Sequence, residues 1–140
     1  MNVLVLALVA AFMSAAPVDV GVIRQQIAAS CGASPEIDID WQSFDNDDNA
    51  MGALSFSRLE FLSAAFAEVC KDASLKPEVA RQIAKVVLSQ AHGAADPVIY
   101  LTQKALHVEY FWVKGEPAPD VAFVAAEIAS RLKGEEAEAP

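Results

Sequence analysis

The sequence predicts an α+β fold in which an antiparallel sheet of three to four strands has helices packed on one face. Some segments place apolar residues every three or four positions, which is typical of helices, and others at every second position, which is typical of strands. These segments follow in the order helix, strand, helix, strands, helix. The short connection between the last two strands suits an antiparallel hairpin.

The first helix is predicted over residues 18–31, and Gly32 is its stop signal. Residues 36–41 then alternate acidic with apolar side chains, the pattern of a half-buried strand. The inward set is Ile37, Ile39 and Trp41, and the outward set is Glu36, Asp38 and Asp40.

A polar loop over residues 45–49 separates this strand from a second helix that is predicted to begin at Ser57. Ser57 and Glu60 have the spacing of a capping box, in which each side chain satisfies a backbone N–H at the helix start. Phe56 and Phe61 have the spacing of a hydrophobic staple. The buried stripe continues through Leu59, Leu62, Phe66 and Val69, with Cys70 at its border.

The second half of the chain supplies the remaining strands. A short helix is predicted over residues 77–81, and the β-branched content of residues 83–88 favours a strand over a continued helix. A turn is expected at His92-Gly93. Strands follow at 98–101 and 105–113, joined by a hairpin at 102–104. The residues between 120 and 134 predict the last helix, capped by Asp120 and closed by Gly134.

The N-terminal residues 1–16 predict a secretory signal peptide, because an apolar run over residues 3–13 is followed by Ser14-Ala15-Ala16. A membrane anchor or a buried core helix is the alternative, although the run is shorter than the ~20 residues that span a bilayer. On this interpretation residues 17–134 form a single α+β domain, and residues 135–140 form a disordered acidic tail. An exported protein, periplasmic or extracellular, is therefore expected, without stable membrane insertion after cleavage.

Cys31 and Cys70 are the only cysteines of the chain, and both lie on or beside predicted apolar stripes. An oxidising compartment favours a disulfide between them. Two buried free thiols are the alternative. A redox-active pair is not expected, because the Cys-x-x-Cys spacing is absent.

The net charge of −9, with ten scattered Lys and Arg residues, argues against binding of nucleic acid or anionic membranes. Cations or a basic protein partner fit this charge better. The oligomeric state is left open by the sequence.

Two polar clusters suggest possible sites. Asp45, Asp47 and Asn49 have the one-three-five spacing of an EF-hand calcium loop, but positions six and twelve are Ala50 and Phe56. A solvated turn is the alternative to a calcium site.

The second cluster forms only if the first and longest strands are neighbours. Asp38 and Asp40 then share the outward face of the sheet with His107 and Glu109, where they could perform acid–base chemistry or hold a metal. The alternative is an ordinary solvated sheet face.

The longest strand also predicts an exposed aromatic residue. Its core stripe is Leu106, Val108, Tyr110 and Trp112, which places Phe111 and Val113 on the polar face. Phe111 either marks a partner surface or is covered by the Pro-rich residues 115–119.

The chain contains no nucleophile elbow, phosphate-binding loop, dinucleotide fingerprint or paired-histidine motif, and no cofactor is expected. The sequence therefore predicts a non-catalytic binding or interaction module with a protein partner, through a surface that includes Asp38, Asp40, His107, Glu109 and Phe111. The alternatives are a hydrolytic or metal-assisted enzyme and a weak calcium-binding protein.

Overall fold

The computed structural model describes residues 19–91, 96–113 and 115–135. The predicted signal peptide, the predicted turn at His92-Gly93 and residues 136–140 lie outside this part of the chain. The described elements are helices α2 (Val20–Cys31), α3 (Asp48–Ser57), α4 (Glu60–Val69), α5 (Lys76–Gln82) and α6 (Val121–Leu132), the short 3-10 helix η1 (Trp41–Phe44), and strands β1 (Glu36–Ile39), β2 (Lys85–Gln90), β3 (Val98–Thr102) and β4 (Ala105–Tyr110).

The four strands form one mixed sheet in the order β1-β2-β4-β3. β1, β2 and β4 are parallel to one another, and only β3 and β4 pair antiparallel. The expectation of an α+β fold is confirmed, but the expectation of an antiparallel sheet is wrong for two of the three strand pairs. The long helical connection between β1 and β2 explains the first parallel pair, because a parallel neighbour needs a crossover of a dozen residues or more.

The hairpin between β3 and β4 is confirmed. Gln103 and Lys104 both have positive φ, at 50° and 64°. Two left-handed residues in succession form the type I′ turn, whose twist matches that of the flanking strands.

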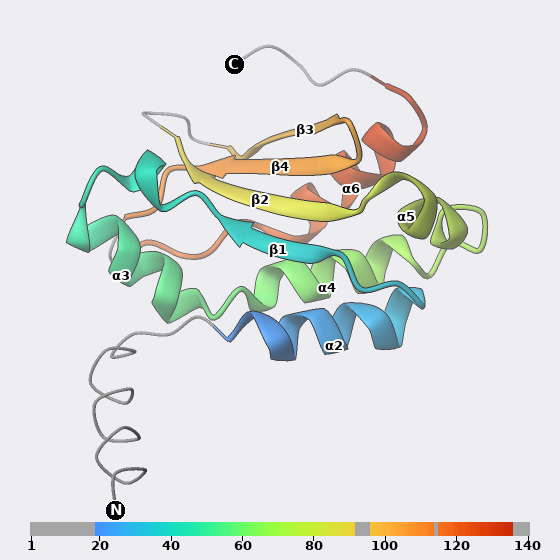
Figure 1. The fold of residues 1–140 in the computed structure, drawn as a ribbon, viewed down its shortest axis with the longest axis horizontal. Helices are drawn as coiled ribbons and strands as arrows, with labels where there is room; N and C mark the ends of the chain where they lie inside the picture. Colours follow the sequence, from blue (N-terminus) through green and yellow to red (C-terminus); the bar gives the residue numbers. More distant parts are fainter. Residues whose placement is uncertain (1–18, 92–95, 114, 136–140) are drawn as a thin grey trace, which may run out of the picture.

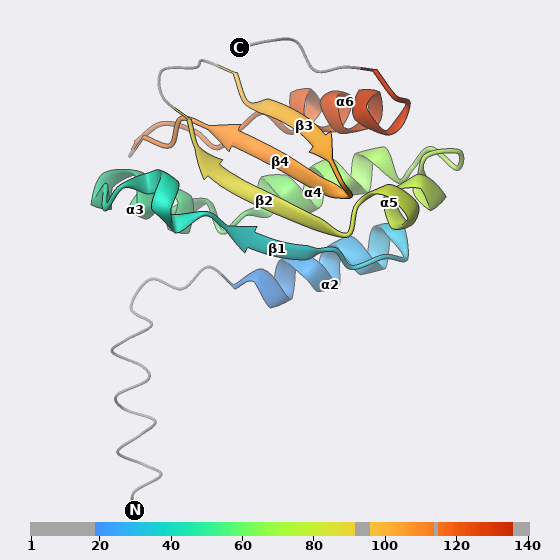
Figure 2. The ribbon, with the colours of Figure 1, turned by 45° about the horizontal axis from the view of Figure 1, so that its top comes forward.

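Helices α2, α4 and α6 lie side by side against one face of the sheet, with α4 in the middle (Figures 1 and 2). α3 lies beyond the carboxyl ends of the parallel strands, and α5 lies near the opposite ends (Figure 1). In both views no described element covers the other face of the sheet. The described residues thus form a two-layer structure in which one face of the sheet is uncovered.

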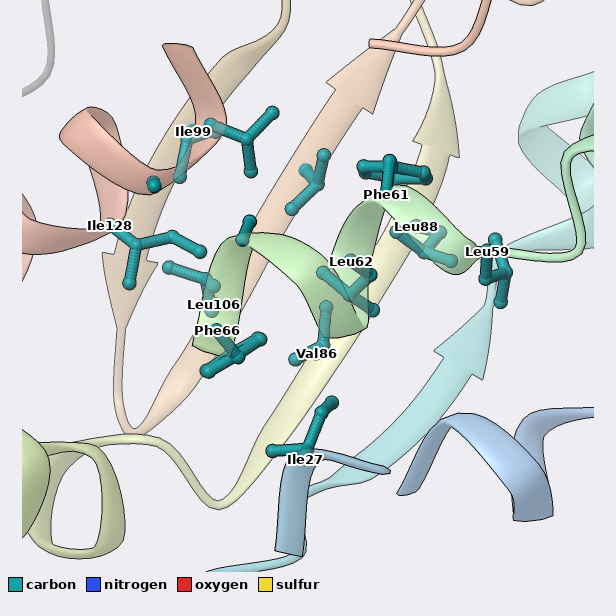
Figure 3. Packing of buried hydrophobic residues seen from close by; sticks show 14 of the residues in the cluster. Ile27, Leu59, Phe61, Leu62, Phe66, Val86, Leu88, Ile99, Leu106 and Ile128 are labelled. Atoms are coloured by element: carbon teal, nitrogen blue, oxygen red, sulfur yellow. The ribbon is translucent and has the colours of Figure 1, made fainter. Parts of the chain in front are cut away.

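The core fills the space between the sheet and these three helices (Figure 3). Val86 and Leu88 of β2 and Leu106 of β4 are fully buried against α4. The predicted α4 stripe is confirmed, since Leu59, Leu62, Phe66 and Val69 are all buried. The predicted β4 stripe is confirmed for Leu106, Val108 and Trp112, which are buried, whereas Tyr110 is half-buried.

The start of α4 differs from the predicted capping box. Ser57 ends α3, and its hydroxyl accepts a hydrogen bond from the backbone N–H of Leu59 at 3.2 Å. Arg58 and Leu59 both adopt the left-handed conformation, with φ of 54° and 59°, and α4 begins at Glu60. A tight turn with two residues in the left-handed conformation therefore stands where the capping box was predicted.

Helix α3 occupies part of the predicted polar loop. Its sequence has a Gly at position 52 and polar residues at its start, which weaken the helical pattern. Asp47 caps it by accepting hydrogen bonds from the N–H groups of Asn49 and Ala50. The spacing of the buried residues Ala50 and Leu54 was the available helical signal.

Trp41 is also placed differently from the prediction. Strand β1 ends at Ile39, and Trp41 starts η1 with 47% of its surface exposed. The chain leaves the strand conformation before Trp41, so the alternation that predicted an inward side chain no longer applies.

Candidate functional site

The uncovered face of the sheet is here called the open face. Every second side chain of each strand points toward it. Strand register places Asp38, Val87, His107 and Tyr100 in one row across all four strands. A second row contains Glu36, Lys85, Ala105 and Thr102, and a third contains Ser89, Glu109 and Val98. These three rows thus contain three carboxylates and one lysine in addition to His107.

The open face has side-chain contacts between β3 and β4. The rings of Tyr100 and His107 stack at a centroid distance of 4.5 Å with an interplanar angle of 5°. The Thr102 hydroxyl and His107 Nε2 are 3.0 Å apart and form a hydrogen bond. Burial of the phenol, together with its hydrogen bond to the Glu109 carboxylate and the charge of that carboxylate, raises the pKa of Tyr100 to about 12. Both ring residues are therefore held in fixed positions.

The sequence-predicted group of Asp38, Asp40, His107 and Glu109 is only partly assembled. His107 and Glu109 lie on β4, but β2 separates them from Asp38 on β1. Two strand spacings correspond to roughly 10 Å. Asp40 lies beyond the end of β1, where its backbone N–H donates to the Leu88 carbonyl at 2.9 Å.

Within the described ranges, no three His, Cys, Asp or Glu side chains lie together in a way that could hold a metal ion. Asp45 and Asp47 both precede α3, and the Asp47 carboxylate caps that helix. Asn49 lies in its first turn. The one-three-five spacing therefore coincides with a helix start.

The carboxyl ends of the parallel strands are joined by a polar network that the sequence analysis missed. The Ser43 hydroxyl donates to the Asp40 carbonyl at 2.6 Å and accepts from the Gln90 N–H at 2.9 Å. The buried Gln90 side chain accepts from the Trp112 N–H, also at 2.9 Å. This hydrogen bond links the end of β2 to the segment that follows β4, and it fixes the position of Trp112.

A surface pocket of about 280 Å³, here called the end pocket, lies next to this network. The end of β4, helix α3, the start of α4 and the Pro-rich segment surround it. Its lining residues are Ala53, Ser57, Glu60, Tyr110, Trp112, Val113, Glu116, Pro117 and Ala118. No sequence motif joins Glu60 with Glu116, because they come from distant segments.

The Pro-rich segment packs beside Tyr110, whose hydroxyl donates to the Pro117 carbonyl at 3.2 Å. Phe111 keeps 41% of its surface exposed. The alternative prediction, that residues 115–119 cover Phe111, is therefore wrong. Within the described residues Phe111, Trp41 and Val22 are the exposed large hydrophobic side chains, and the first two lie just past the ends of β4 and β1.

The predicted disulfide is confirmed. Cys31 and Cys70 are bonded, with their Cα atoms 5.3 Å apart. Cys31 is the last residue of α2, and Cys70 directly follows α4. The bond therefore fastens the ends of two neighbouring helices beneath the sheet.

No helix among the described residues is long and apolar enough to cross a membrane. No family model matches the chain, and neither the curated proteins nor the solved structures give a match. The open face and the end pocket are therefore the features of the molecule that indicate a function.

Proposed function

We propose that this protein is an exported, disulfide-linked binding module without catalytic activity, and that its open face binds a basic protein partner. One observation carries the proposal. β1, β2 and β4 are parallel, yet no described element covers one of their faces. Parallel strands in proteins are normally covered on both faces. A partner that docks on the open face supplies the missing layer.

The charges of this surface favour a partner rich in Lys and Arg. Glu36, Asp38 and Glu109 outnumber Lys85 there, and the whole chain has a net charge of −9. Complementary charge accelerates encounter and selects the partner. The exposed Phe111 adds an aromatic residue of the kind that is enriched at interfaces.

The enzyme alternative depended on carboxylates and a histidine that act together. The register places β2 between Asp38 and His107, so this pair lacks the hydrogen-bond distance that proton transfer requires. Binding of a partner does not require that these side chains contact one another. It needs only an ordered surface, which the stacked Tyr100 and His107 rings supply.

Export is tested by the intact mass of the protein produced with its native N-terminus in an export-competent host. The expected product begins near Pro17 and gains about 2 Da on reduction, because two thiols replace one disulfide. A full-length product with free thiols contradicts the export proposal.

Partner binding is tested by capture from an extract of the native organism, with quantitative mass spectrometry. The variant Asp38→Lys/Glu109→Lys reverses two charges on the open face. It is expected to reduce recovery of a specific partner at least about tenfold, since like charges then face each other. Increasing salt is expected to weaken capture by the unmodified protein.

The matched control is Glu68→Lys/Glu135→Lys, which changes the net charge equally but lies away from the open face. Glu68 forms only an exposed ion pair with Lys71, so its loss costs little stability. Equal recovery by both variants, with melting temperatures like that of the unmodified protein, excludes the open face as the binding surface.

A further inference from the structure

We infer that the end pocket binds the side chain of an arginine from the partner. This inference deepens the proposed function, on which it rests for the basic character of the partner. It assigns one recognition element at a defined place on the surface.

The size of the pocket suits a single side chain. Sites for drug-sized ligands usually have volumes of roughly 300–1,000 Å³. The end pocket has a volume of about 280 Å³, just below that range. It is also open to the surface at the edge of the molecule, so a side chain can enter it while the rest of the partner stays outside.

The charge of the lining selects a cation. Glu60 and Glu116 both line the pocket, and among the described residues that line it there is no Lys, Arg or His. Within the described residues neither carboxylate takes part in an ion pair. A guanidinium carries several donors in one plane and can bond two carboxylate groups, which a compact ammonium does less well.

The remaining walls suit the methylene stem and the flat head of arginine. Ala53, Val113, Pro117 and Ala118 are apolar or small, and long basic side chains bury their stems along such surfaces. Tyr110 supplies an aromatic wall, and its hydroxyl is held by the Pro117 carbonyl. Its ring lies edge-to-face with Trp112 at 5.0 Å. An aromatic ring beside a desolvated guanidinium adds a favourable cation–π contact.

The titration of Tyr110 agrees with a carboxylate placed at this wall. Burial raises the pKa of the Tyr110 phenol, and the negative charges of Glu116 and Asp96 raise it further. The same negative potential that opposes formation of a tyrosinate stabilises a bound cation.

The location of the pocket connects it with the open face. Glu109 lies on the open face, Phe111 is exposed, and Tyr110 and Trp112 line the pocket. Both regions thus include residues at the carboxyl end of β4. In open sheets with parallel strands, ligands bind at this end. A partner that docks on the open face and extends past the carboxyl end of β4 is expected to place an arginine in the pocket.

The experiment is an NMR titration of the oxidised protein with N-acetyl-arginine amide as the probe. Saturable shifts are expected for the Trp112 indole N–H and for the amides of Val113 and Glu116. N-acetyl-citrulline amide has nearly the same shape but no charge, and it is expected to produce no saturable shift. Trp41→Phe assigns the two indole signals.

The variant Glu60→Gln/Glu116→Gln keeps the pocket volume and removes both charges. It is expected to weaken probe binding at least about tenfold, whereas Glu68→Gln/Glu135→Gln leaves it unchanged. Equal shifts with arginine and citrulline, or unchanged binding in the Glu60/Glu116 variant, overturn the inference. The probe needs no natural partner. If the probe does not bind but the open face still captures a partner, only the arginine-pocket inference is refuted. If the probe binds but charge reversal on the open face does not reduce capture, only the proposed partner surface is refuted.

Discussion

Cys31 and Cys70 show how two single residues constrain a large part of the chain. The bond joins residues 39 apart in sequence and fastens the end of α2 to the end of α4. Both sulfur-bearing residues are buried within the core. In the chain-entropy account, such a bond stabilises the folded state mainly by restricting the unfolded chain.

Removal of the disulfide is expected to lower the free energy of unfolding by about 4 kcal/mol, according to the chain-entropy relation for a loop of this length. The measurement is urea denaturation of the oxidised protein and of the Cys31→Ala/Cys70→Ala variant. Reductant should destabilise the unmodified protein and leave the variant unaffected. Equal stability of the two oxidised samples contradicts the prediction.

Tyr100 gives a pH-dependent signal from the open face. Its pKa in the folded protein is about 12, above the usual value of 10, first because of burial and then because of Glu109. The neutral phenol is therefore favoured by folding. The associated stability is fully present below pH 10 and is lost as the pH rises through the folded-state pKa.

In a Tyr110→Phe background, absorbance at the tyrosinate wavelength is expected to report titration of Tyr100 near pH 12 in the folded protein and near pH 10 in urea. Glu109→Gln is expected to lower the folded-state pKa but not to restore the urea value, because burial remains. An unchanged pKa in the Glu109→Gln variant means that the carboxylate does not act on Tyr100.

Among the elements, three helices begin at an aspartate. Asp19, Asp47 and Asp120 each accept hydrogen bonds from backbone N–H groups in the first turn of α2, α3 and α6. These N–H groups have no partner within the helix, and the carboxylate also suits the positive end of the helix dipole. Short polar side chains at these positions therefore fix where the helices start.

Asp120→Ala is expected to destabilise the protein by about 1 kcal/mol, because two first-turn N–H groups of α6 lose their acceptor. The control is Asp40→Ala. Asp40 precedes η1 in the same way, but its side chain makes no capping hydrogen bond. Urea denaturation of both variants checks the difference, and equal losses rule out capping as the cause.

At the scale of the whole molecule, the excess of acidic residues produces electrostatic repulsion across the folded protein. Nineteen Asp and Glu residues face ten Lys and Arg residues in the chain. The three ion pairs among the described residues are all between neighbours on one helix or at its end, so they scarcely link distant elements. Repulsion among the remaining carboxylates opposes the compact state.

The melting temperature at neutral pH is expected to rise by about 3 °C between low salt and 0.5 M NaCl, because salt screens this repulsion. Near pH 4.5, the isoelectric point of the sequence, the same salt is expected to have almost no effect. Thermal unfolding followed by circular dichroism measures both. If salt raises the melting temperature equally at the two pH values, net charge is not the cause of the effect.

The sequence by itself determined most elements and their buried sides. The three-and-four spacing in α2, α4 and α6, and the alternation in β1 and β4, identify which side chains face the core. This follows because the repeat of each backbone fixes which residues share a face. The Asp120 cap, the hairpin at Gln103-Lys104 and the two cysteines are likewise local signals.

Only the tertiary structure decided the strand order, the parallel pairing and the end pocket. Periodicity reports which face of a strand is apolar, but not which strand lies beside it. β4 inserts between β2 and β3, so the separation of Asp38 from His107 has no local signal. The presence of Glu60 and Glu116 in the lining of one pocket has none either. Such distances depend on the path of the chain through its crossovers, which is set by the packing of the whole helical layer on the sheet.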